Sequence, residues 1–499
     1  MLKRFLKLIF AGVVLSFCLA AFYFFKFQPS AQTAQAAGDF HYVRAGATGL
    51  NNGSDWTNAW TTLPATLVRG DAYYIADGEY GSYIFDDAVS GTQYITIKKA
   101  IESDHGTDTG WNANFCGGQA VFESTLIFNN GYYVFDGQSG GGPGSWNLGL
   151  GFKIEALLPT STLINVTNRV SSSGKAPQNI IIEHTEFEHL GREYNSQGSN
   201  ARAIYQYGYG FDNATISNNY FHDFPASIIQ TGNSTNLTLE NNFFDTNGAY
   251  VNGSSVQAYG FGDYCSNDVV IRNNIFKDIE NKIIALYGNH GACAKDNWQI
   301  YNNVFYFSAN HPEDSLEDQA PVMADSGTVT NNVLVYNNVF SGIHGGGAGV
   351  WLYSGDNNRV FNNIFYNNTG NNLYLGNASS EHGNNWFYGN MRYNPESTTS
   401  ACRVYGACPL IPGHANGYTP DETTAEIGTG DPFIDSANGD FRLSAPTQAG
   451  YILSSPYNLD ILGNTRGSDG VWDRGAYEYI SVPAPDTTPP SAPSGVSAN

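Results

Sequence analysis

Short strands of alternating polarity recur along this chain, and each ends at a pair of asparagines. The strands read ATIS (214–217), LTLE (237–240), VVIR (269–272), WQIY (298–301), VLVY (333–336) and RVFN (359–362). A phrase of the form Asn-Asn-apolar-Phe follows each one, for example NNVFYF at 302–307. Asparagine tolerates left-handed backbone and bonds its own backbone, so the pair predicts a corner. We interpret the phrase as structural: asparagine makes the corner, and phenylalanine stacks inside.

The spacing of the phrases predicts a solenoid. Their phenylalanines lie at 221, 244, 276, 305, 340 and 365, at intervals of 23 to 35 residues. A period in the twenties with insertions of variable length is typical of stacked coils. A degenerate unit at 180–190 places His184 at the asparagine position. We therefore expect an all-β chain without substantial α-helix.

Three strands per turn and an asparagine-rich corner resemble the right-handed parallel β-helix of the pectin-lyase-like superfamily. The segments 41–63 and 439–479 resemble the opening and the closing module of exported bacterial β-helix proteins. The resemblance implies a β-helix over 38–395 and a C-terminal capping module over 396–480. Residues 481–499 resemble a linker, and we expect them to be extended and disordered.

The N-terminus predicts export. Lys3, Arg4 and Lys7 precede a long apolar run, and small residues follow near Ala36, so residues 1–37 form a signal peptide or an uncleaved anchor. We expect a secreted or cell-surface monomer that contacts a membrane only through this segment. Export permits disulfides, and we expect Cys402 to pair with Cys408 and Cys265 with Cys293. Cys116 is left over.

A third strand of each coil carries the candidate binding face. We align 203–207, 227–231, 255–259, 283–287, 321–325, 349–353 and 372–376 as equivalent strands. Side chains alternate across a strand, which would turn Ile204, Ile228 and Val256 inward. The outward positions would then carry an aromatic row: Tyr205, Tyr207, Tyr259, Tyr287, Trp351, Tyr353 and Tyr374. Aromatic rings in a row suit sugar rings, although loops could instead cover the row and make it a second core.

The same alignment supplies candidate catalytic residues. Asp325 replaces an aromatic residue in the row, Asp263 and Asp296 follow in turns, Lys282 precedes its strand, and His290 lies in the next turn. Hydrolysis would use two carboxylates, and a lyase would use a base such as Lys or Arg near a uronate. Acidic residues 313–318 could overhang the face or form a solvated loop. The same numbering places Cys265 and Cys293 six residues after Tyr259 and Tyr287.

The net charge and composition of the chain limit the kinds of partner that it could bind. The net charge of −22 and scattered basic residues argue against nucleic acid. The sequence pattern requires no cofactor. Calcium is the cofactor that an acidic lyase surface would accommodate, and its ligands are unknown. The sequence predicts a polysaccharide-binding β-helix that acts as a lyase or glycoside hydrolase. The alternative is a non-enzymatic adhesin or envelope protein, and a convergent acid/base pair on the aromatic face would discriminate the two.

Overall fold

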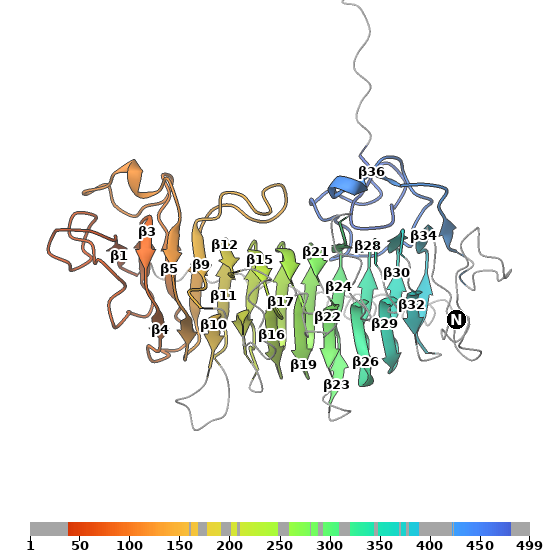
Figure 1. Cartoon of the computed structure of the whole chain (residues 1–499), viewed down its shortest axis with the longest axis horizontal. Coiled ribbons are helices and arrows are strands. Elements are labelled where there is room, and N and C mark those ends of the chain that lie inside the picture. The colour runs from red at the N-terminus through yellow and green to blue at the C-terminus, as the bar shows by residue number, and fades with distance from the viewer. Residues whose placement is uncertain are drawn as a thin grey trace, which may run out of the picture.

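Stacked coils of three strands build the molecule (Figure 1). The computed structural model describes residues 38–480 except 159–160, 168–176, 191–200, 207–209, 248–258, 280, 288–292, 309–319, 344–347, 369–370, 376–378, 389–421 and 423. The predicted leader, the Cys402–Cys408 pair and the 481–499 linker lie outside these residues. No α-helix occurs in the described part, and hence no helix there that is long and apolar enough to span a membrane.

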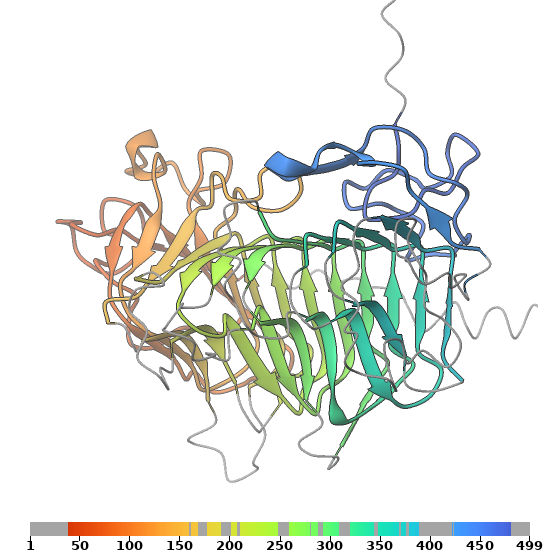
Figure 2. The same ribbon diagram turned by 45° about the vertical axis from the view of Figure 1, so that its right-hand side comes forward.

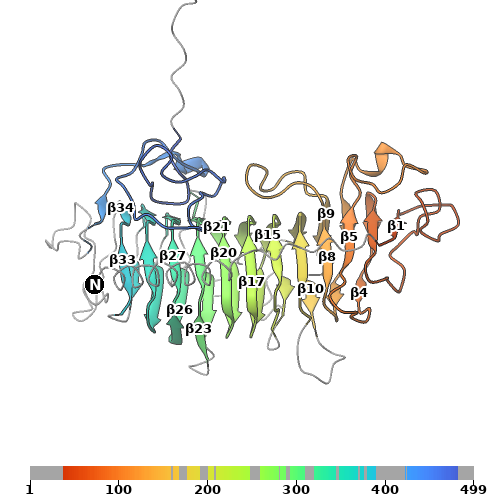
Figure 3. The ribbon, with the colours of Figure 1, turned by 180° about the vertical axis from the view of Figure 1, so that it is seen from behind.

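Parallel pairing between successive coils generates three long sheets. Sheet A has 12 strands, seen from behind in Figure 3: β1 (Phe40–Val43), β2 (Ala72–Ile75), β5 (Ile95–Lys99), β8 (Tyr133–Asp136), β11 (Ile180–Glu183), β14 (Thr215–Ser217), β17 (Thr235–Glu240), β20 (Asn267–Arg272), β24 (Gln299–Tyr301), β27 (Leu334–Tyr336), β30 (Arg359–Phe361) and β33 (Glu381–Gly383).

Sheet B also has 12 strands: β3 (Gly78–Tyr80), β6 (Ala120–Phe122), β9 (Phe152–Glu155), β12 (Thr185–Glu188), β15 (Tyr220–Phe224), β18 (Phe243–Asn247), β21 (Ile275–Ile279), β25 (Val304–Tyr306), β28 (Val339–Ser341), β31 (Ile364–Tyr366), β34 (Trp386–Tyr388) and β35 (Glu426–Ile427).

Sheet C has 11 strands: β4 (Tyr83–Phe85), β7 (Leu126–Phe128), β10 (Thr162–Val166), β13 (Arg202–Tyr205), β16 (Ile229–Gly232), β19 (Phe261–Tyr264), β22 (Lys282–Tyr287), β26 (Ala320–Asn331), β29 (Ala348–Ser354), β32 (Asn371–Leu375) and β23 (Ala294–Asp296), which pairs only with β26. Two 3₁₀ turns, η1 (Ala113–Phe115) and η3 (Ser436–Asn438), and the hairpin β36 (Phe433–Asp435) and β37 (Asp440–Leu443) complete the described elements.

The asparagine pair works as the sequence predicts. The first asparagine of each pair adopts left-handed backbone, as at Asn302 with φ 55°, and His184 does so with φ 53° in the degenerate unit. The second asparagine is buried and bonds its counterpart in the next coil: Asn303 Nδ2 donates to Asn338 Oδ1 over 3.0 Å. The ladder ends where Asn385 Nδ2 donates to Glu422 Oε2 over 3.0 Å. Buried polar groups are thereby paired along the corner.

Phenylalanine fills the interior beside this ladder. Phe276 stacks on Phe305 with ring centroids 5.0 Å apart, and Phe305 stacks on Phe340 at the same spacing. Isoleucine, leucine and valine from sheets A and C complete one continuous core. The confirmed fold is an all-β parallel β-helix.

The C-terminal residues 424–480 lie along one side of the coils (Figure 2). They dock on the first asparagines of the corners: Asn302 Nδ2 donates to the Leu459 carbonyl over 2.8 Å, and Asn362 Nδ2 donates to the Tyr451 carbonyl over 2.8 Å. An apolar cluster seals the contact with the outer face of sheet B: Val304, Val339, Ile364, Trp386, Phe433, Phe441, Leu443, Ile461, Ala476 and Tyr477. The capping module over 396–480 stays a prediction; among its described residues, Glu422 ends the ladder and residues 424–480 lie along a flank of the coils.

Candidate functional site

The outer face of sheet C differs in register from the alignment that the sequence suggests. Ile204 pairs with Ile229 rather than Ile228, and Ile229 pairs with Phe261. The strand of the third coil is therefore β19 and not 255–259. Both segments alternate in polarity, so period two alone could not choose between them. The chosen register places the bulky Phe261 in the core, where it is fully buried.

This register changes which tyrosines face one another. Tyr264 pairs with Tyr287, and their rings stack with centroids 5.1 Å apart and planes 21° from parallel. Tyr259, predicted as a surface platform, is only 2% exposed. The Tyr287 hydroxyl donates to the Tyr259 hydroxyl oxygen over 2.7 Å. Tyr259 is therefore a buried hydrogen-bond partner of Tyr287. Tyr264, which the sequence alignment missed, is the tyrosine that lies beside Tyr287 on the outer face.

Two cations flank the tyrosines. The Arg202 guanidinium lies 4.8 Å from the centroid of the Tyr205 ring, and burial lowers its pKa. Lys282 Nζ donates to the Tyr287 hydroxyl oxygen over 3.3 Å and lies 5.3 Å from that ring's centroid. Cations over aromatic faces gain electrostatic energy. The described face thus holds an aromatic–cationic cluster, which we define as Arg202, Tyr205, Tyr264, Lys282 and Tyr287.

The aromatic row continues beyond this cluster. Trp351 pairs with Met323 in one neighbouring coil and with Tyr374 in the other. Trp351 is partly exposed, whereas Met323 is 8% exposed. The backbones of Asp325, Tyr353 and Tyr374 lie in β26, β29 and β32. Their side-chain roles stay predictions, and Tyr207, His290 and the acidic segment 313–318 lie outside the described residues.

The Asp263 carboxylate does not lie on the outer face of sheet C. Its partner Leu286 points into the core, and Asp263 itself is fully buried. It forms an ion pair with Lys295, which is also fully buried, and accepts hydrogen bonds from the Thr231 hydroxyl (2.7 Å) and the Ser266 amide (2.9 Å). The prediction failed because the register shift turns position 263 inward. Asp263 stabilises the coil interior.

Asp296 belongs to a second polar ladder, at the corner between sheets C and A. Its amide donates to Asn267 Oδ1 over 2.9 Å, and its carboxylate accepts from Asn331 Nδ2 over 2.8 Å. Asn331 Oδ1 in turn accepts from the Asp356 amide over 3.0 Å. Asp296 therefore joins coils at a corner and does not face the aromatic–cationic cluster.

The disulfide between Cys265 and Cys293 is confirmed. Their Cα atoms lie 5.6 Å apart, within the normal range for a bridge. Cys265 directly follows Tyr264, at the end of β19, with φ 66°. The bridge therefore ties the end of the strand that carries Tyr264 to the residue before β23. It fixes one wall of the aromatic–cationic cluster.

A second charged group lies on the outer face of sheet B, and sequence reasoning did not find it. His222 Nδ1 bonds Asp223 over 2.7 Å, and Nε2 bonds Glu186 over 3.3 Å. These two carboxylates raise the pKa of His222 to about 9 against the effect of burial. Lys153 bonds Glu155 over 2.9 Å and also pairs with Glu188. Alternating charges in HTEFEHL (184–190) and NYFHDF (219–224) were the available signal.

Two groups of side chains among the described residues have a ligand set for a cation. Glu186, Glu188 and His222 form one; Asp136, Glu183 and His184 form the other. In the first, His222 is protonated at neutral pH and Lys153 pairs with Glu188, so two cations already lie among the carboxylates. In the second, His184 Nδ1 bonds Asp136 over 2.8 Å. Neither group lies on sheet C, where calcium would serve a lyase.

Comparison with known proteins agrees with the architecture. A family model described as a right handed beta helix region matches residues 165–316. The matched segment is therefore a right-handed parallel β-helix, the fold that the sequence predicts. No curated protein matches the chain.

Solved structures resemble it at low identity. Pectate lyase Pel9A is 15% identical with a TM-score of 0.45, covering 90% of this chain and 98% of the lyase. XylC in complex with xylose is 11% identical with a TM-score of 0.47, covering 86% and 97%. The surface protein and adhesin PfbA of Streptococcus pneumoniae is 15% identical with a TM-score of 0.32, covering 64% and 86%.

Proposed function

We propose that this protein binds an acidic polysaccharide on the outer face of sheet C and cleaves it by β-elimination. The carrying observation is the aromatic–cationic cluster, in which Lys282 bonds Tyr287, Tyr287 stacks on Tyr264, and Arg202 lies over Tyr205 and interacts electrostatically with Tyr264. Aromatic faces suit the C–H faces of sugar rings, and the cations suit uronate carboxylates. Neutral sugars alone would not require two cations on this face.

The cluster also supplies a group for proton transfer. The Lys282 ammonium, 3.3 Å from the Tyr287 oxygen, would stabilise a tyrosinate. Tyr287 would take the proton from the carbon beside the uronate carboxylate. The released electron pair forms a carbon–carbon double bond while the glycosidic C–O bond breaks. Tyr287 then returns the proton to the leaving oxygen, so that no proton is gained or lost overall.

Hydrolysis has weaker support from the described residues. It needs two carboxylates on the same face at a set separation. Asp263 is sealed in the core and Asp296 belongs to a corner ladder, which removes two of the three carboxylates that the sequence suggested. Asp325 remains a candidate for binding or for protonating a leaving group.

We further propose that the protein acts outside the cytoplasm. The Cys265–Cys293 disulfide supports this location, because disulfides persist in oxidising compartments. The N-terminal sequence of basic residues followed by an apolar run supports it independently.

The test is a screen of residues 38–480 against uronate and neutral polysaccharides. Ultraviolet absorbance reports the unsaturated product of elimination, and a reducing-end assay reports any cleavage. Lys282→Met should abolish the absorbance, while Lys277→Met, which removes a cation from sheet B, should leave it unchanged. Trp351→Ala should weaken binding by about 1–3 kcal/mol, the scale of an aromatic anchor.

The possible results separate the functions. Reducing ends without absorbance would show a hydrolase and contradict the elimination. Binding of a polysaccharide without cleavage would show a binding module or adhesin. Absence of binding to every polysaccharide would overturn the proposal.

A further inference from the structure

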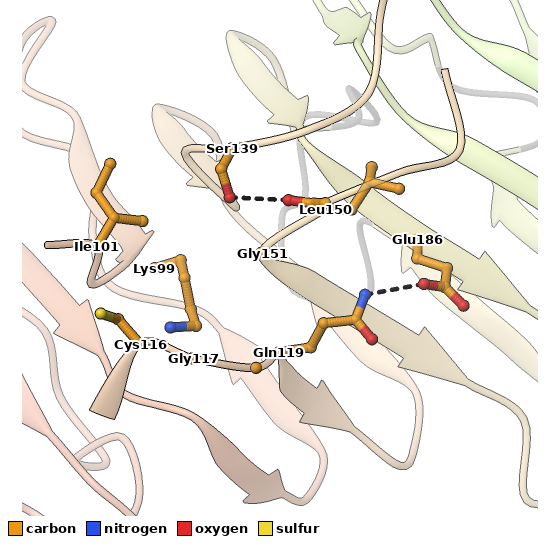
Figure 4. Close-up of a pocket in the computed structure, with 11 residues that line it drawn as sticks. Lys99, Ile101, Cys116, Gly117, Gln119, Ser139, Leu150, Gly151 and Glu186 are labelled. Atoms are coloured by element: carbon orange, nitrogen blue, oxygen red, sulfur yellow. Dashed lines mark hydrogen bonds between the residues drawn. The ribbon is translucent and has the colours of Figure 1, made fainter. Parts of the chain in front are cut away.

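A polar pocket of about 390 Å³ lies on another side of the molecule, at the corner between sheets A and B (Figure 4). It opens between the segment after η1 and the base of the glycine-rich segment 137–151. Cys116 and Glu186 lie on opposite sides of it. Its lining is Lys99, Ile101, Cys116, Gly117, Gly118, Gln119, Ser139, Gly149, Leu150, Gly151 and Glu186. This volume lies within the range of small-molecule sites.

Missing side chains create the hollow. A Cβ added at Gly117 would meet no atom within 4 Å, and one at Gly149 would come no closer than 3.8 Å to another atom, the Gly140 Cα. Gly117 lines the pocket and its backbone is not in the left-handed region, so a larger residue there would meet no atom near its Cβ and no backbone strain. The pocket can therefore be filled by substitution.

Most side-chain hydrogen-bond donors around the pocket are bonded to the protein itself. Lys99 Nζ, on a side chain 1% exposed, bonds Asp77 (2.6 Å) and the Ala100 carbonyl (2.8 Å). Gln119 Nε2 donates to Glu186 Oε2 over 2.8 Å. The Ser139 hydroxyl donates to the Gly149 carbonyl over 2.9 Å. Most of these side-chain donors are thus bonded to the protein, and Gln119 Nε2 keeps one further N–H.

Acceptors remain. Within the described part of the chain, no group donates to Gln119 Oε1, and the Ser139 oxygen keeps its lone pairs. Glu186 stays ionised because His222 and Gln119 donate to it, and its pKa is lowered. An anionic ligand would meet repulsion here, whereas hydroxyl groups would find partners.

We infer that this pocket is a second carbohydrate site, which binds one non-anionic sugar ring through its hydroxyl groups. The hydroxyls would donate to Glu186, Gln119 Oε1 and Ser139. The ring would lie over the glycine backbone of 117–118 and 149–151. This inference does not rest on the proposed function, and its charge preference is opposite to that of the aromatic–cationic cluster on sheet C.

Cys116 provides a built-in reporter. It lines the pocket, and it is the one cysteine outside a disulfide among the described residues. The rate of iodoacetamide labelling is followed on the Cys116 peptide by mass spectrometry, with glucose, galactose, mannose, glucosamine or glucuronate present. A bound ring should slow labelling, by about tenfold at a sugar concentration ten times the Kd. Glucuronate should give no protection at the same concentration.

Filled-pocket variants confirm the place of binding. Saturation-transfer NMR of the protecting sugar should lose its signal in Gly117→Leu. Gly81→Leu is the matched control, because a Cβ at Gly81 also meets nothing within 4 Å but lies outside the pocket. Gln119→Leu is a second pocket variant should Gly117→Leu not fold.

Three results would overturn the inference. They are labelling that no sugar slows, labelling that glucuronate slows as much as the neutral sugars do, and a sugar signal that survives in the folded pocket variants.

Discussion

Tyr264 and Tyr287 stack on each other from neighbouring coils, and the Tyr287 hydroxyl group bonds both Lys282 and Tyr259. The two rings offer the same kind of surface to a sugar. The oxygen of Tyr287 lies within hydrogen-bonding distance of the Lys282 ammonium. The proposed function therefore assigns proton transfer to Tyr287 and ring contact to both.

The variant Tyr287→Phe separates these roles. It keeps the stacked ring and removes the oxygen that would carry the proton. We expect binding of the polysaccharide to change by less than about threefold, while turnover falls by about 10²–10⁴-fold, the usual loss of a general acid–base group. Initial rates and calorimetric affinities measure both. Tyr264→Phe is the matched control, and an equal loss of turnover there would remove the special role of Tyr287.

The asparagine ladder should dominate the stability of the coils. Asn303 Nδ2 donates to the Ile271 carbonyl over 2.9 Å as well as to Asn338. Asn303→Asp would set carboxylate oxygens against these acceptors in the interior, and we expect a loss of about 3 kcal/mol or more. Asn332→Asp changes an exposed corner residue and should cost less than about 0.5 kcal/mol. Urea unfolding compares them; similar losses would contradict the role of the ladder.

The buried pair of Lys295 and Asp263 should also be structural. Lys295→Met leaves the Asp263 carboxylate in the core without its cation, which typically costs about 3–5 kcal/mol. Lys277→Met removes a partly exposed partner of Asp245 and should cost less than about 1 kcal/mol. The free energy of unfolding measures this difference. A Lys295→Met protein as stable as Lys277→Met would argue against a structural role.

His222 should make stability fall at alkaline pH. Its pKa is raised from 6.5 to about 9 by Asp223 and Glu186, so the folded state holds the proton more tightly than the unfolded state. The stabilisation is complete below pH 6.5 and is lost as the pH rises through about 9, at most about 3 kcal/mol. Unfolding at several pH values should show this slope in the wild type and not in His222→Gln. An identical slope in both would exclude His222 as its source.

The sequence was sufficient for the fold because its signal repeats in every coil. Asn302 with Asn303 and Phe305 form one local phrase, and this phrase occurs six times in all. Corner, ladder and core stack all follow from this phrase. The matching cysteines at 265 and 293 likewise indicated a bridge, although the strand register used to align them was wrong.

The candidate site was less predictable because it depends on register and on distant residues. The alternating segments 255–259 and 261–264 fit a strand equally well, and only the packing of Phe261 decides between them. Glu186 and His222 meet across coils although they are 36 residues apart, and no spacing rule connects them. The docking of residues 449–459 on Asn302 and Asn362 is equally invisible in the sequence.

The most direct measurement of the central claim is the affinity of Arg202→Gln for a uronate oligosaccharide and for its carboxyl-reduced, neutral counterpart. If sheet C recognises the carboxylate through Arg202, the variant should bind the acidic oligosaccharide about 1.5–3 kcal/mol more weakly, the worth of a charged hydrogen bond. It should bind the neutral oligosaccharide as the wild type does. Unchanged affinity of Arg202→Gln for the acidic oligosaccharide, or an equal loss for both, would contradict recognition of an acidic polysaccharide by this face.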